Sequence, residues 1–268
     1  MNKKIGLIGS GNMAQAIIGG IINSKLTNSE NIVVSDKSEE ALNTVKEKYK
    51  VETTTDNVYV ASKSEILILA VKPNIYPVVI KEIKGAVDDS TIIVSIAAGK
   101  SISSIESAFG KPIKLIRVMP NTPAMVGEGM AALCPNTEVP EDEISDVLAI
   151  FNSFGKGEVI DEKLIDAVTA VSGSSPAYVY MFIEALADGA VLQGMPRDKA
   201  YKFAAQAVLG SAKMVLETGE HPGKLKDNVC SPGGTTIEAV ATLEKLGFRS
   251  AVISAVNTCA EKSQKMSQ

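Results

Sequence analysis

Tryptophan is absent from the 268 residues, histidine occurs once, and the three cysteines lie far apart. A single histidine excludes a metal site built from several histidines, so we expect no bound metal ion. Cys134, Cys230 and Cys259 fit neither a CxxC pair nor a disulfide framework. Unpaired cysteines are typical of reducing compartments, and we therefore expect a cytoplasmic protein.

Long apolar runs and clusters of basic residues are also missing. No apolar stretch reaches the roughly 20 uncharged residues that a bilayer span requires. The short apolar run after Lys4 passes into glycines, which favours a buried first strand over a signal peptide. The formal net charge is −4, and no basic run offers a surface for a phosphate backbone. We expect neither a membrane nor a nucleic acid as partner.

The first half of the sequence alternates short β-rich runs with helical patterns. The expected strands cover residues 4–8, 31–35, 66–71, 91–96 and 113–119. Continuous apolar strands are typical of a parallel sheet that is buried on both faces. Helices between successive strands imply right-handed crossovers. The predicted fold class is α/β, with an N-terminal Rossmann-type, doubly wound parallel sheet.

From about residue 163 the sequence shows helical patterns and no convincing strand. Four helices are expected, over residues 176–193, 198–217, 235–246 and 249–262. We place the boundary at Asp161, between a dinucleotide-binding Rossmann domain (1–161) and an all-α domain for dimerisation and substrate binding (162–268). Helices that are apolar almost all round cannot hide their surface in a unit of this size. We expect a homodimer through the helical domain, and further assembly of dimers is left open.

A glycine-rich turn follows the first expected strand and opens the first helix. Gly9, Gly11 and Ala14 have the G-x-G-x-x-A spacing of dinucleotide-binding turns. The first glycine permits a tight turn, the second lets the backbone approach a pyrophosphate, and the alanine lets the helix pack on the strand. The helix N-terminus offers free N–H groups to the phosphates. The expected cofactor contacts are Gly9, Ser10, Gly11, Asn12 and Met13. The alternative is a tight turn without a ligand.

The end of the second strand should meet the adenosine ribose of such a cofactor. Asp36 could accept a hydrogen bond from the 2′-hydroxyl, which favours NADH. Ser35 and Lys37 could instead hold a 2′-phosphate, which favours NADPH. A third interpretation is that Asp36 only caps the next helix. The predicted cofactor is therefore NADPH or NADH.

Two later strand ends should line the same crevice, where small residues leave room for a flat ring system. The expected contacts there are Ala70, Val71, Lys72, Pro73, Ala97 and Ala98, with Asn57 on the adenosine side. Lys72 could equally be a surface lysine before a turn.

A loop in the second half, residues 231–236 (Ser-Pro-Gly-Gly-Thr-Thr), places two glycines and two hydroxyls at the start of a helix. Backbone N–H groups and threonine hydroxyls there would form a pocket for a small anion such as a carboxylate. The residues support a second interpretation equally well, namely a helix N-cap with a flexible entry loop. His221 stands at another helix start, where a capping or surface role is favoured over acid–base catalysis. Cys230 is interpreted as a small packed residue.

Several stretches together resemble the pyrroline-5-carboxylate reductase family. The most specific is residues 226–236 (Lys-Asp-Asn-Val-Cys-Ser-Pro-Gly-Gly-Thr-Thr), followed by Thr-Leu-Glu at 242–244. The glycine turn, residues 70–73, residues 117–123 (Arg-Val-Met-Pro-Asn-Thr-Pro) and residues 172–178 (Ser-Gly-Ser-Ser-Pro-Ala-Tyr) agree with it. The resemblance covers nearly the whole chain. It implies an oxidoreductase that transfers hydride from NAD(P)H to the cyclic imine 1-pyrroline-5-carboxylate, giving L-proline in the last step of proline biosynthesis.

The resemblance also implies roles for individual residues. In this family the helical domain of one subunit completes the site with its dimer partner. By position, the family's contacts to the substrate carboxylate and ring nitrogen correspond to Ser231, Gly234, Thr235 and Thr236. Gly233 lies in the same loop and is also assigned to the substrate. Val229, assigned to the substrate, and Asn228, assigned to the cofactor, would lie near the nicotinamide. The family's cofactor contacts correspond by position to Asn57, Val71, Lys72, Ala97 and Ala98.

Two positions depart from the family pattern. Ser175 stands where many relatives have glycine, and we expect only a small effect. Asp36 stands where NADPH-preferring relatives often carry serine or another uncharged residue, which leaves the preference for NADPH open.

The chemistry needs little from side chains, because the imine carbon is electrophilic and the cofactor supplies the hydride. Our hypothesis is that Thr236 is the catalytic residue, which hydrogen-bonds the ring nitrogen and stabilises the amine as it forms. Glu162, at the domain junction, is a weaker candidate for closing the substrate pocket.

Other functions remain as alternatives: a reductase of another imine, a hydroxyacid dehydrogenase, a dinucleotide sensor and a structural oligomer. The dehydrogenase would need a lysine in the first long helix of the second half, and residues 176–193 contain none. A sensor would have no reason to keep the loop at 231–236.

Overall fold

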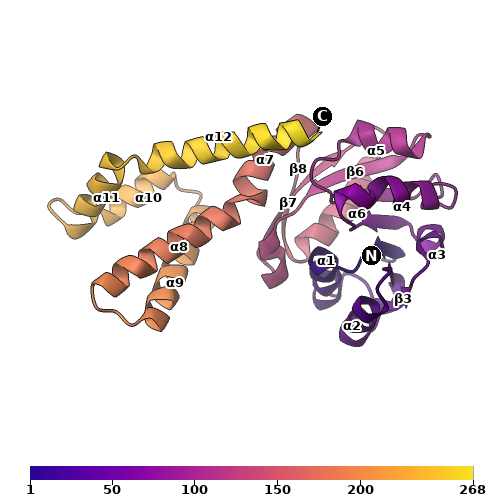
Figure 1. The fold of residues 1–268 in the computed structure, drawn as a ribbon, viewed down its shortest axis with the longest axis horizontal. Helices are drawn as coiled ribbons and strands as arrows, with labels where there is room; N and C mark the ends of the chain where they lie inside the picture. Colours follow the sequence, from indigo (N-terminus) through magenta and orange to yellow (C-terminus); the bar gives the residue numbers. More distant parts are fainter. Residues whose placement is uncertain (268) are drawn as a thin grey trace. The chain divides into compact units, whose positions relative to one another are not determined.

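The computed structural model describes residues 1–267 and divides into two compact units (Figure 1). The first unit comprises Met1–Ser174 together with the segment from Cys259 onward. The second unit comprises Ser175–Thr258. The boundary that we predicted at Asp161 falls before two short helices and a π-helical turn, which cluster with the sheet.

The first unit is built on one eight-stranded sheet with the order β3-β2-β1-β4-β5-β6-β7-β8. The strands are β1 (Ile5–Ile8), β2 (Ile32–Ser35), β3 (Glu52–Thr54), β4 (Ile66–Leu69), β5 (Ile92–Ser95), β6 (Lys114–Met119), β7 (Gly129–Pro135) and β8 (Gly155–Val159). The first six are parallel, and β7 turns back antiparallel to β6. The predicted α/β class is confirmed, and the antiparallel edge is a feature that we did not predict.

Helices cover both faces of the sheet, and each face has its own apolar core. The helices are α1 (Asn12–Asn23), α2 (Glu39–Tyr49), α3 (Asn57–Lys63), α4 (Tyr76–Ile83), α5 (Ile102–Phe109) and α6 (Glu141–Asn152). Buried side chains of α1, α2 and α6 meet one face, and those of α3, α4 and α5 meet the other. Alternate residues of β1 divide between the faces, with Leu7 in the first core and Ile8 in the second.

Local capping explains where several of these helices begin and end. The side chain of Ser38 accepts a hydrogen bond from the backbone of Ala41 at the start of α2. Acidic residues occupy the first turn of that helix and lysines its last turn, which complements the helix dipole. Asp56 caps α3 in the same way, through the backbone N–H groups of Val58 and Tyr59.

Short helical segments lead from the sheet into the second unit. They are η4 (Glu162–Leu164), α7 (Ile165–Val168) and the π-helical turn η5 (Thr169–Gly173), and other short turns are η1 (Ser29–Asn31), η2 (Pro73–Ile75) and η3 (Thr122–Val126). The remaining helices are α8 (Ser175–Leu192), α9 (Arg197–Thr218), α10 (Pro222–Val229), α11 (Thr235–Lys245) and α12 (Phe248–Ser267). The predicted absence of strands from residue 163 is confirmed for the described residues.

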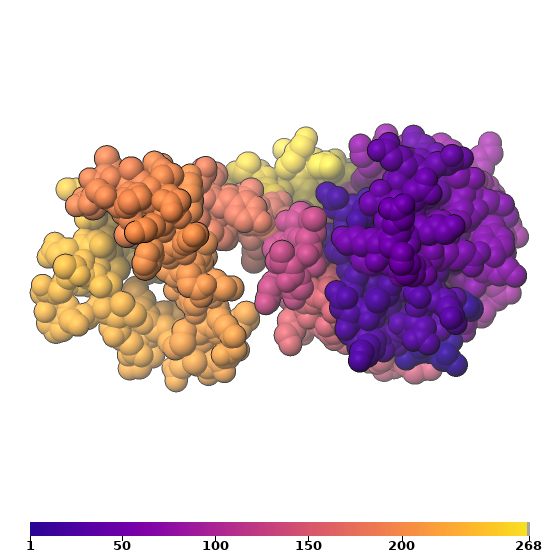
Figure 2. All heavy atoms as spheres, turned by 90° about the horizontal axis from the view of Figure 1, so that it is seen from below, coloured from indigo at the N-terminus to yellow at the C-terminus, as the bar shows by residue number. Residues whose placement is uncertain are grey.

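The second unit has little core of its own. Its buried cluster consists of Ala187, Ala200 and Ala204, where α8 packs against α9. The following large apolar side chains of this unit are exposed: Tyr180, Met181, Leu192, Phe203, Leu209, Met214, Leu216, Leu246 and Ile253. In the space-filling view, openings separate the orange and yellow helices of this unit (Figure 2). No helix within residues 1–267 is long and apolar enough to cross a membrane.

Candidate active site

The direction of the strand order reverses between β1 and β4, which are hydrogen-bonded neighbours. In open parallel sheets, ligands bind at the carboxyl ends of the strands where the order reverses. The turn after β1 contains Gly9, and the segment after β4 begins with Ala70. The topology therefore brings two of the predicted cofactor segments to one edge of the sheet.

Gly9 and Gly11 meet different demands in the turn. Gly9 has a φ of +104°, and a Cβ on it would lie 2.5 Å from the carbonyl oxygen of Ala70. No side chain could replace this hydrogen without moving the segment after β4. A Cβ on Gly11 would meet nothing within 4 Å, so the side of the turn next to it is open.

The start of α1 is suited to an anion. Gly11 is its N-cap, and no side chain caps the helix. The first N–H groups of α1, which include those of Asn12 and Met13, therefore remain available for a phosphate. Ala14 is buried in the core beneath them, as the G-x-G-x-x-A pattern predicts. An open glycine and an uncapped helix N-terminus together fit a pyrophosphate.

Asp36 is held against the glycine turn. One carboxylate oxygen accepts hydrogen bonds from the Ser10 N–H (2.9 Å) and the Ser10 hydroxyl (2.7 Å), and the other accepts from the Ser38 N–H (3.0 Å). Partial burial acts to raise the pKa of Asp36, but these hydrogen bonds outweigh it, so the pKa lies below its usual value. The carboxylate therefore carries a full negative charge at neutral pH, at the end of β2.

Ser35 is fully buried, and its hydroxyl donates to Asn57 Oδ1 at 2.7 Å. The Asn57 amide nitrogen donates in turn to Glu82 at 2.9 Å. Both side chains are thus engaged with each other beneath the end of β2. Of the two residues considered for a 2′-phosphate, only Lys37 is exposed.

The segments after β4 and β5 hold the remaining predicted cofactor residues. Ala70, Val71 and Pro73 are half-buried, and Lys72 is exposed. Ala97 is buried and Ala98 half-buried, both just beyond the end of β5. Because Leu69 and Ser95 are register partners, the two segments leave the sheet side by side.

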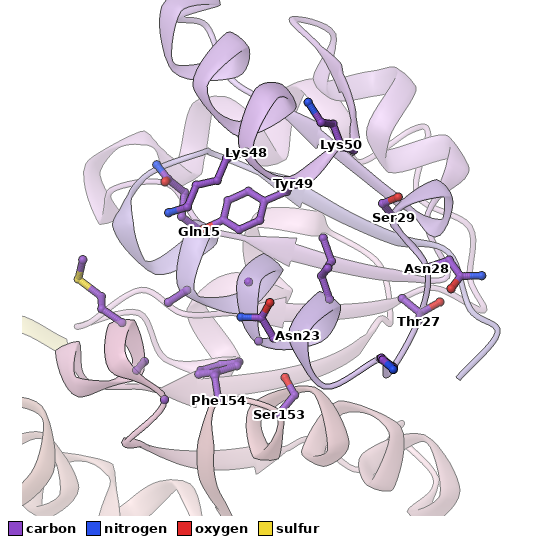
Figure 3. A pocket seen from close by; sticks show the side chains of 18 of the residues that line it. Gln15, Asn23, Thr27, Asn28, Ser29, Lys48, Tyr49, Lys50, Ser153 and Phe154 are labelled. Atoms are coloured by element: carbon purple, nitrogen blue, oxygen red, sulfur yellow. The ribbon is translucent and has the colours of Figure 1, made fainter.

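A hollow of about 1060 Å³ lies along the outer side of α1 (Figure 3). Its lining includes Gln15, Asn23 and Phe154, and the Lys48 ammonium lies 5.0 Å from the centre of the Tyr49 ring. Among the predicted cofactor residues, only Asn12 lines this hollow. It is therefore a different feature from the cofactor site that we predict at the strand ends.

The predicted substrate loop joins α10 to α11 in the second unit. Gly233 has a φ of +67°, and the Gly234 N–H donates to the Ser231 carbonyl at 3.0 Å, which closes a tight turn. Gly234 is the N-cap of α11, and no side chain caps the helix. Thr235 and Thr236 form its first turn, next to free backbone N–H groups. This arrangement fits a small anion, as the first of our two interpretations requires.

The residues before this loop belong to α10 and to its two ends. Asn228 and Val229 end α10 and are exposed. His221 caps α10, because its Nδ1 accepts a hydrogen bond from the Gly223 N–H at 3.1 Å. The capping role predicted for His221 is confirmed. Cys230 follows α10 and is half-buried.

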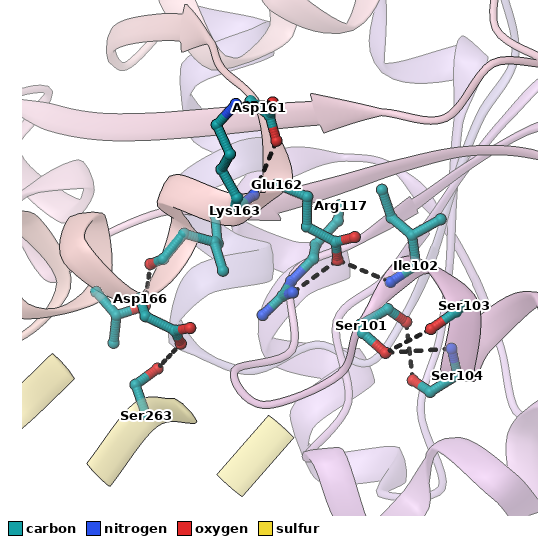
Figure 4. A network of polar contacts seen from close by, with 12 residues as sticks. Ser101, Ile102, Ser103, Ser104, Arg117, Asp161, Glu162, Lys163, Asp166 and Ser263 are labelled. Atoms are coloured by element: carbon teal, nitrogen blue, oxygen red, sulfur yellow. Dashed lines mark hydrogen bonds and ion pairs between the residues drawn. The ribbon is translucent and has the colours of Figure 1, made fainter. Parts of the chain in front are cut away.

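Glu162 does not stand alone at the junction. Its carboxylate accepts hydrogen bonds from Arg117 Nη1 at 2.7 Å and from the Ile102 N–H at 2.9 Å (Figure 4). Arg117 is buried on β6, so this ion pair joins the sheet, the start of α5 and the start of η4. The Ser263 hydroxyl similarly donates to Asp166 at 2.6 Å. The sequence motif at 117–123 signalled Arg117, but not its partner.

The predicted cofactor residues of the glycine turn and strand ends lie in the first unit, and the substrate loop lies in the second. Each cluster is therefore described separately. Within residues 1–267 no group of three His, Cys, Asp or Glu side chains could hold a metal ion.

Two family models match the chain. A model of pyrroline-5-carboxylate reductase dimerisation matches residues 162–266. A second model, described as NADP oxidoreductase coenzyme F420-dependent, matches residues 4–99.

The curated relatives and solved structures agree with these models. Pyrroline-5-carboxylate reductase of Escherichia coli is 53% identical over 268 residues, covering 100% of both chains. The structure of a pyrroline-5-carboxylate reductase from Coxiella burnetii superposes with a TM-score of 0.95 at 34% identity, covering 100% of both chains. A Plasmodium falciparum pyrroline carboxylate reductase with NADP bound gives a TM-score of 0.89 at 36% identity, covering 100% of this chain and 99% of the other.

Proposed function

The chain belongs to the pyrroline-5-carboxylate reductase family, and from this we propose that it reduces 1-pyrroline-5-carboxylate to L-proline with NADPH or NADH. The observation that carries this function is the 53% identity over the full length of the E. coli enzyme. It is an oxidoreductase that acts on a C=N bond. The free cysteines further support our proposal of a cytoplasmic location.

A nicotinamide cofactor, when bound, supplies the hydride. The open side of Gly11 and the uncapped N-terminus of α1 would hold its pyrophosphate. Asp36 would meet the adenosine ribose, and the segments at 70–73 and 97–98 would contact the nicotinamide half. These residues bind and orient the cofactor, and none of them needs to transfer a proton.

The loop at 231–236 would hold the substrate. Its carboxylate fits the free N–H groups at the start of α11, where the helix dipole favours an anion. Thr236, in the first turn, would hydrogen-bond the ring nitrogen and fix the orientation of the imine. Positioning of this kind lowers the barrier because it aligns the reacting atoms. The proton that the ring nitrogen must gain would come from water next to the Thr236 hydroxyl.

One assay tests the proposed activity. Purified protein mixed with NADH or NADPH should oxidise the cofactor when pyrroline-5-carboxylate is added, seen as a loss of nicotinamide absorbance. L-Proline should appear in equal amount. No consumption of either cofactor would refute the proposed function.

We also propose that Asp36 makes NADH the preferred cofactor of this chain. The carboxylate is ionised and lies at the end of β2, where a 2′-phosphate would otherwise be placed. The buried hydroxyl of Ser35 donates to Asn57, so of the two residues considered for a 2′-phosphate only Lys37 would remain to bind it.

Residues 162–268 are proposed as the dimerisation and substrate domain. The exposed apolar side chains of α8, α9 and α12 support a homodimer through these helices, because a monomer would leave them in water. The dimerisation model over residues 162–266 agrees with this proposal. Each subunit would then complete the site of its partner.

The dimer has a direct test in solution. Light scattering after size-exclusion chromatography should give a dimer, or a multiple of it, at micromolar concentration. Met181 on α8 is 68% exposed, and Met181→Lys should shift the assembly toward monomer, because an interface would bury the new charge. Val78 on α4, with 66% exposure, supplies a matched control: Val78→Lys should leave the assembly unchanged. A monomeric wild-type protein would contradict the proposal.

A further inference from the structure

Tyr76 is a buried polar residue that neither the sequence analysis nor the proposed site includes. It is the first residue of α4, and its side chain is enclosed in the core with 2% exposure. A buried hydroxyl must find hydrogen-bond partners, since leaving it unpaired costs free energy. The partners of Tyr76 identify what it holds together.

The phenol oxygen of Tyr76 lies between the ends of two strands. It donates a hydrogen bond to the carbonyl oxygen of Leu69, the last residue of β4, at 2.7 Å. It accepts one from the hydroxyl of Ser95, the last residue of β5, at 3.0 Å. Leu69 and Ser95 are register partners, so one hydroxyl bridges β4 and β5 at the point where their ladder ends.

The same bond closes the segment that follows β4. Leu69 precedes this segment and Tyr76 follows it, so the hydrogen bond joins its two ends across residues 70–75. That segment holds four of the proposed cofactor contacts, residues 70–73. The bond from Ser95, the residue just before the segment at 96–98, ties the end of β5 to the same point.

The hydroxyl keeps its proton under all working conditions. Burial is the largest influence on Tyr76 and raises its pKa far above the usual value, although the hydrogen bonds from Ser95, Ile96 and Ala97 oppose this. The phenol therefore stays protonated at neutral pH and can donate to Leu69. A phenol that donates to Leu69 and accepts from Ser95 fixes the separation of the two strand ends.

We propose that Tyr76 is a positioning residue for the nicotinamide half of the cofactor. Through Leu69 and Ser95 it sets the separation of the segments at 70–73 and 97–98, between which the flat nicotinamide ring would bind. This inference rests on the proposed function, because it assumes the dinucleotide crevice at the strand ends. The adenosine half would bind at β1 and β2, on the other side of the point where the strand order reverses.

The test separates the two halves of the cofactor. Tyr76→Phe keeps the ring and removes the hydroxyl. NADH and NADPH binding can be followed by nicotinamide fluorescence, undisturbed by tryptophan, which the chain lacks. ADP-ribose, which lacks the nicotinamide, can be followed by calorimetry. We expect the Kd of the preferred cofactor to rise about fivefold, the effect of losing part of one buried hydrogen bond, while the Kd of ADP-ribose stays within about twofold.

Two further variants check the bridge itself. Ser95→Ala removes the donor on β5 and should reproduce the loss, and the double variant should be no weaker than either single one, because both break one network. Tyr59 lies on α3, and its exposed hydroxyl donates to Glu52, so Tyr59→Phe is the matched control and should change neither Kd.

Three results would overturn the inference. An unchanged Kd for the dinucleotide in Tyr76→Phe would show that the bridge does not act on the cofactor. Equal weakening of the dinucleotide and of ADP-ribose would show a general structural role. Wild-type protein that binds ADP-ribose but neither NADH nor NADPH would remove the nicotinamide subsite, and the proposed function with it.

Discussion

Replacing Thr236 with alanine should lower kcat about 100-fold, the order of effect that one well-placed hydrogen-bonding group has on a reacting centre. Thr236 lies in the first turn of α11, whose N-terminus no side chain caps. Its hydroxyl is the group of the 231–236 loop that we assign to the ring nitrogen. The proposed cofactor residues 9–13 and 97–98 belong to the first unit, so the KM for NADH or NADPH should change little.

Steady-state kinetics with both substrates varied can measure this split between kcat and KM. Thr236→Ser retains the hydroxyl and should recover most of the activity. Thr242 lies on the same helix, and its hydroxyl donates to the Glu238 carbonyl at 3.0 Å, so Thr242→Ala is a matched control that should keep normal turnover. If Thr236→Ala turns over as fast as wild type, Thr236 has no part in the mechanism.

Asp36→Ser should shift the preference between the two cofactors, measured as the ratio of kcat/KM values, by roughly 10- to 100-fold toward NADPH. Two like charges about 4 Å apart repel by about 4 kcal/mol at an effective dielectric constant of 20. Solvent and salt reduce this repulsion at the half-exposed end of β2. In the variant, kcat/KM with NADPH should rise, because the repulsion of the 2′-phosphate is removed. With NADH, kcat/KM should fall, because the acceptor for the 2′-hydroxyl is removed.

Opposite changes with the two cofactors distinguish selection from damage. Asp36 also holds Ser10, so a disturbed glycine turn would lower kcat/KM with both NADH and NADPH. Asp36→Asn keeps the size of the side chain and one acceptor oxygen, and should show the gain with NADPH in weaker form. Glu47→Gln removes an exposed carboxylate from the last turn of α2 and should leave the ratio unchanged. A wild-type preference for NADPH that Asp36→Ser does not alter would refute the assignment.

Much of the fold could be predicted because local patterns report burial. The five predicted strands correspond to β1, β2, β4, β5 and β6, whose apolar runs are buried on both faces. The strands that were missed are edge strands or a reversed one. β3 contains only Glu-Thr-Thr, β8 is Gly-Lys-Gly-Glu-Val, and neither shows an apolar period. The direction of β7 depends on its pairing with β6, which no local pattern encodes.

The candidate site likewise has features that the sequence predicted and features that it did not. The glycine spacing and the 231–236 loop could be found because tight turns and helix starts depend on a few adjacent residues. Glu162 was found as a residue at the junction, but its pairing with Arg117 was not, since the two lie on separate elements. Tyr76 gave no signal, because the sequence does not distinguish a tyrosine that packs its ring in the core from one whose hydroxyl also bridges two strands.

By itself the sequence determined the alternation of strands and helices, the dinucleotide turn and the family resemblance, because each of these depends on short-range spacing and residue type. Only the tertiary structure decided that Asp36 bonds to Ser10, that Ser35 is engaged with Asn57, and that the Tyr76 hydroxyl bridges Leu69 and Ser95. These contacts join side chains from different elements. Their partners are chosen by how the sheet is ordered and packed, which the spacing of residues along the chain does not specify.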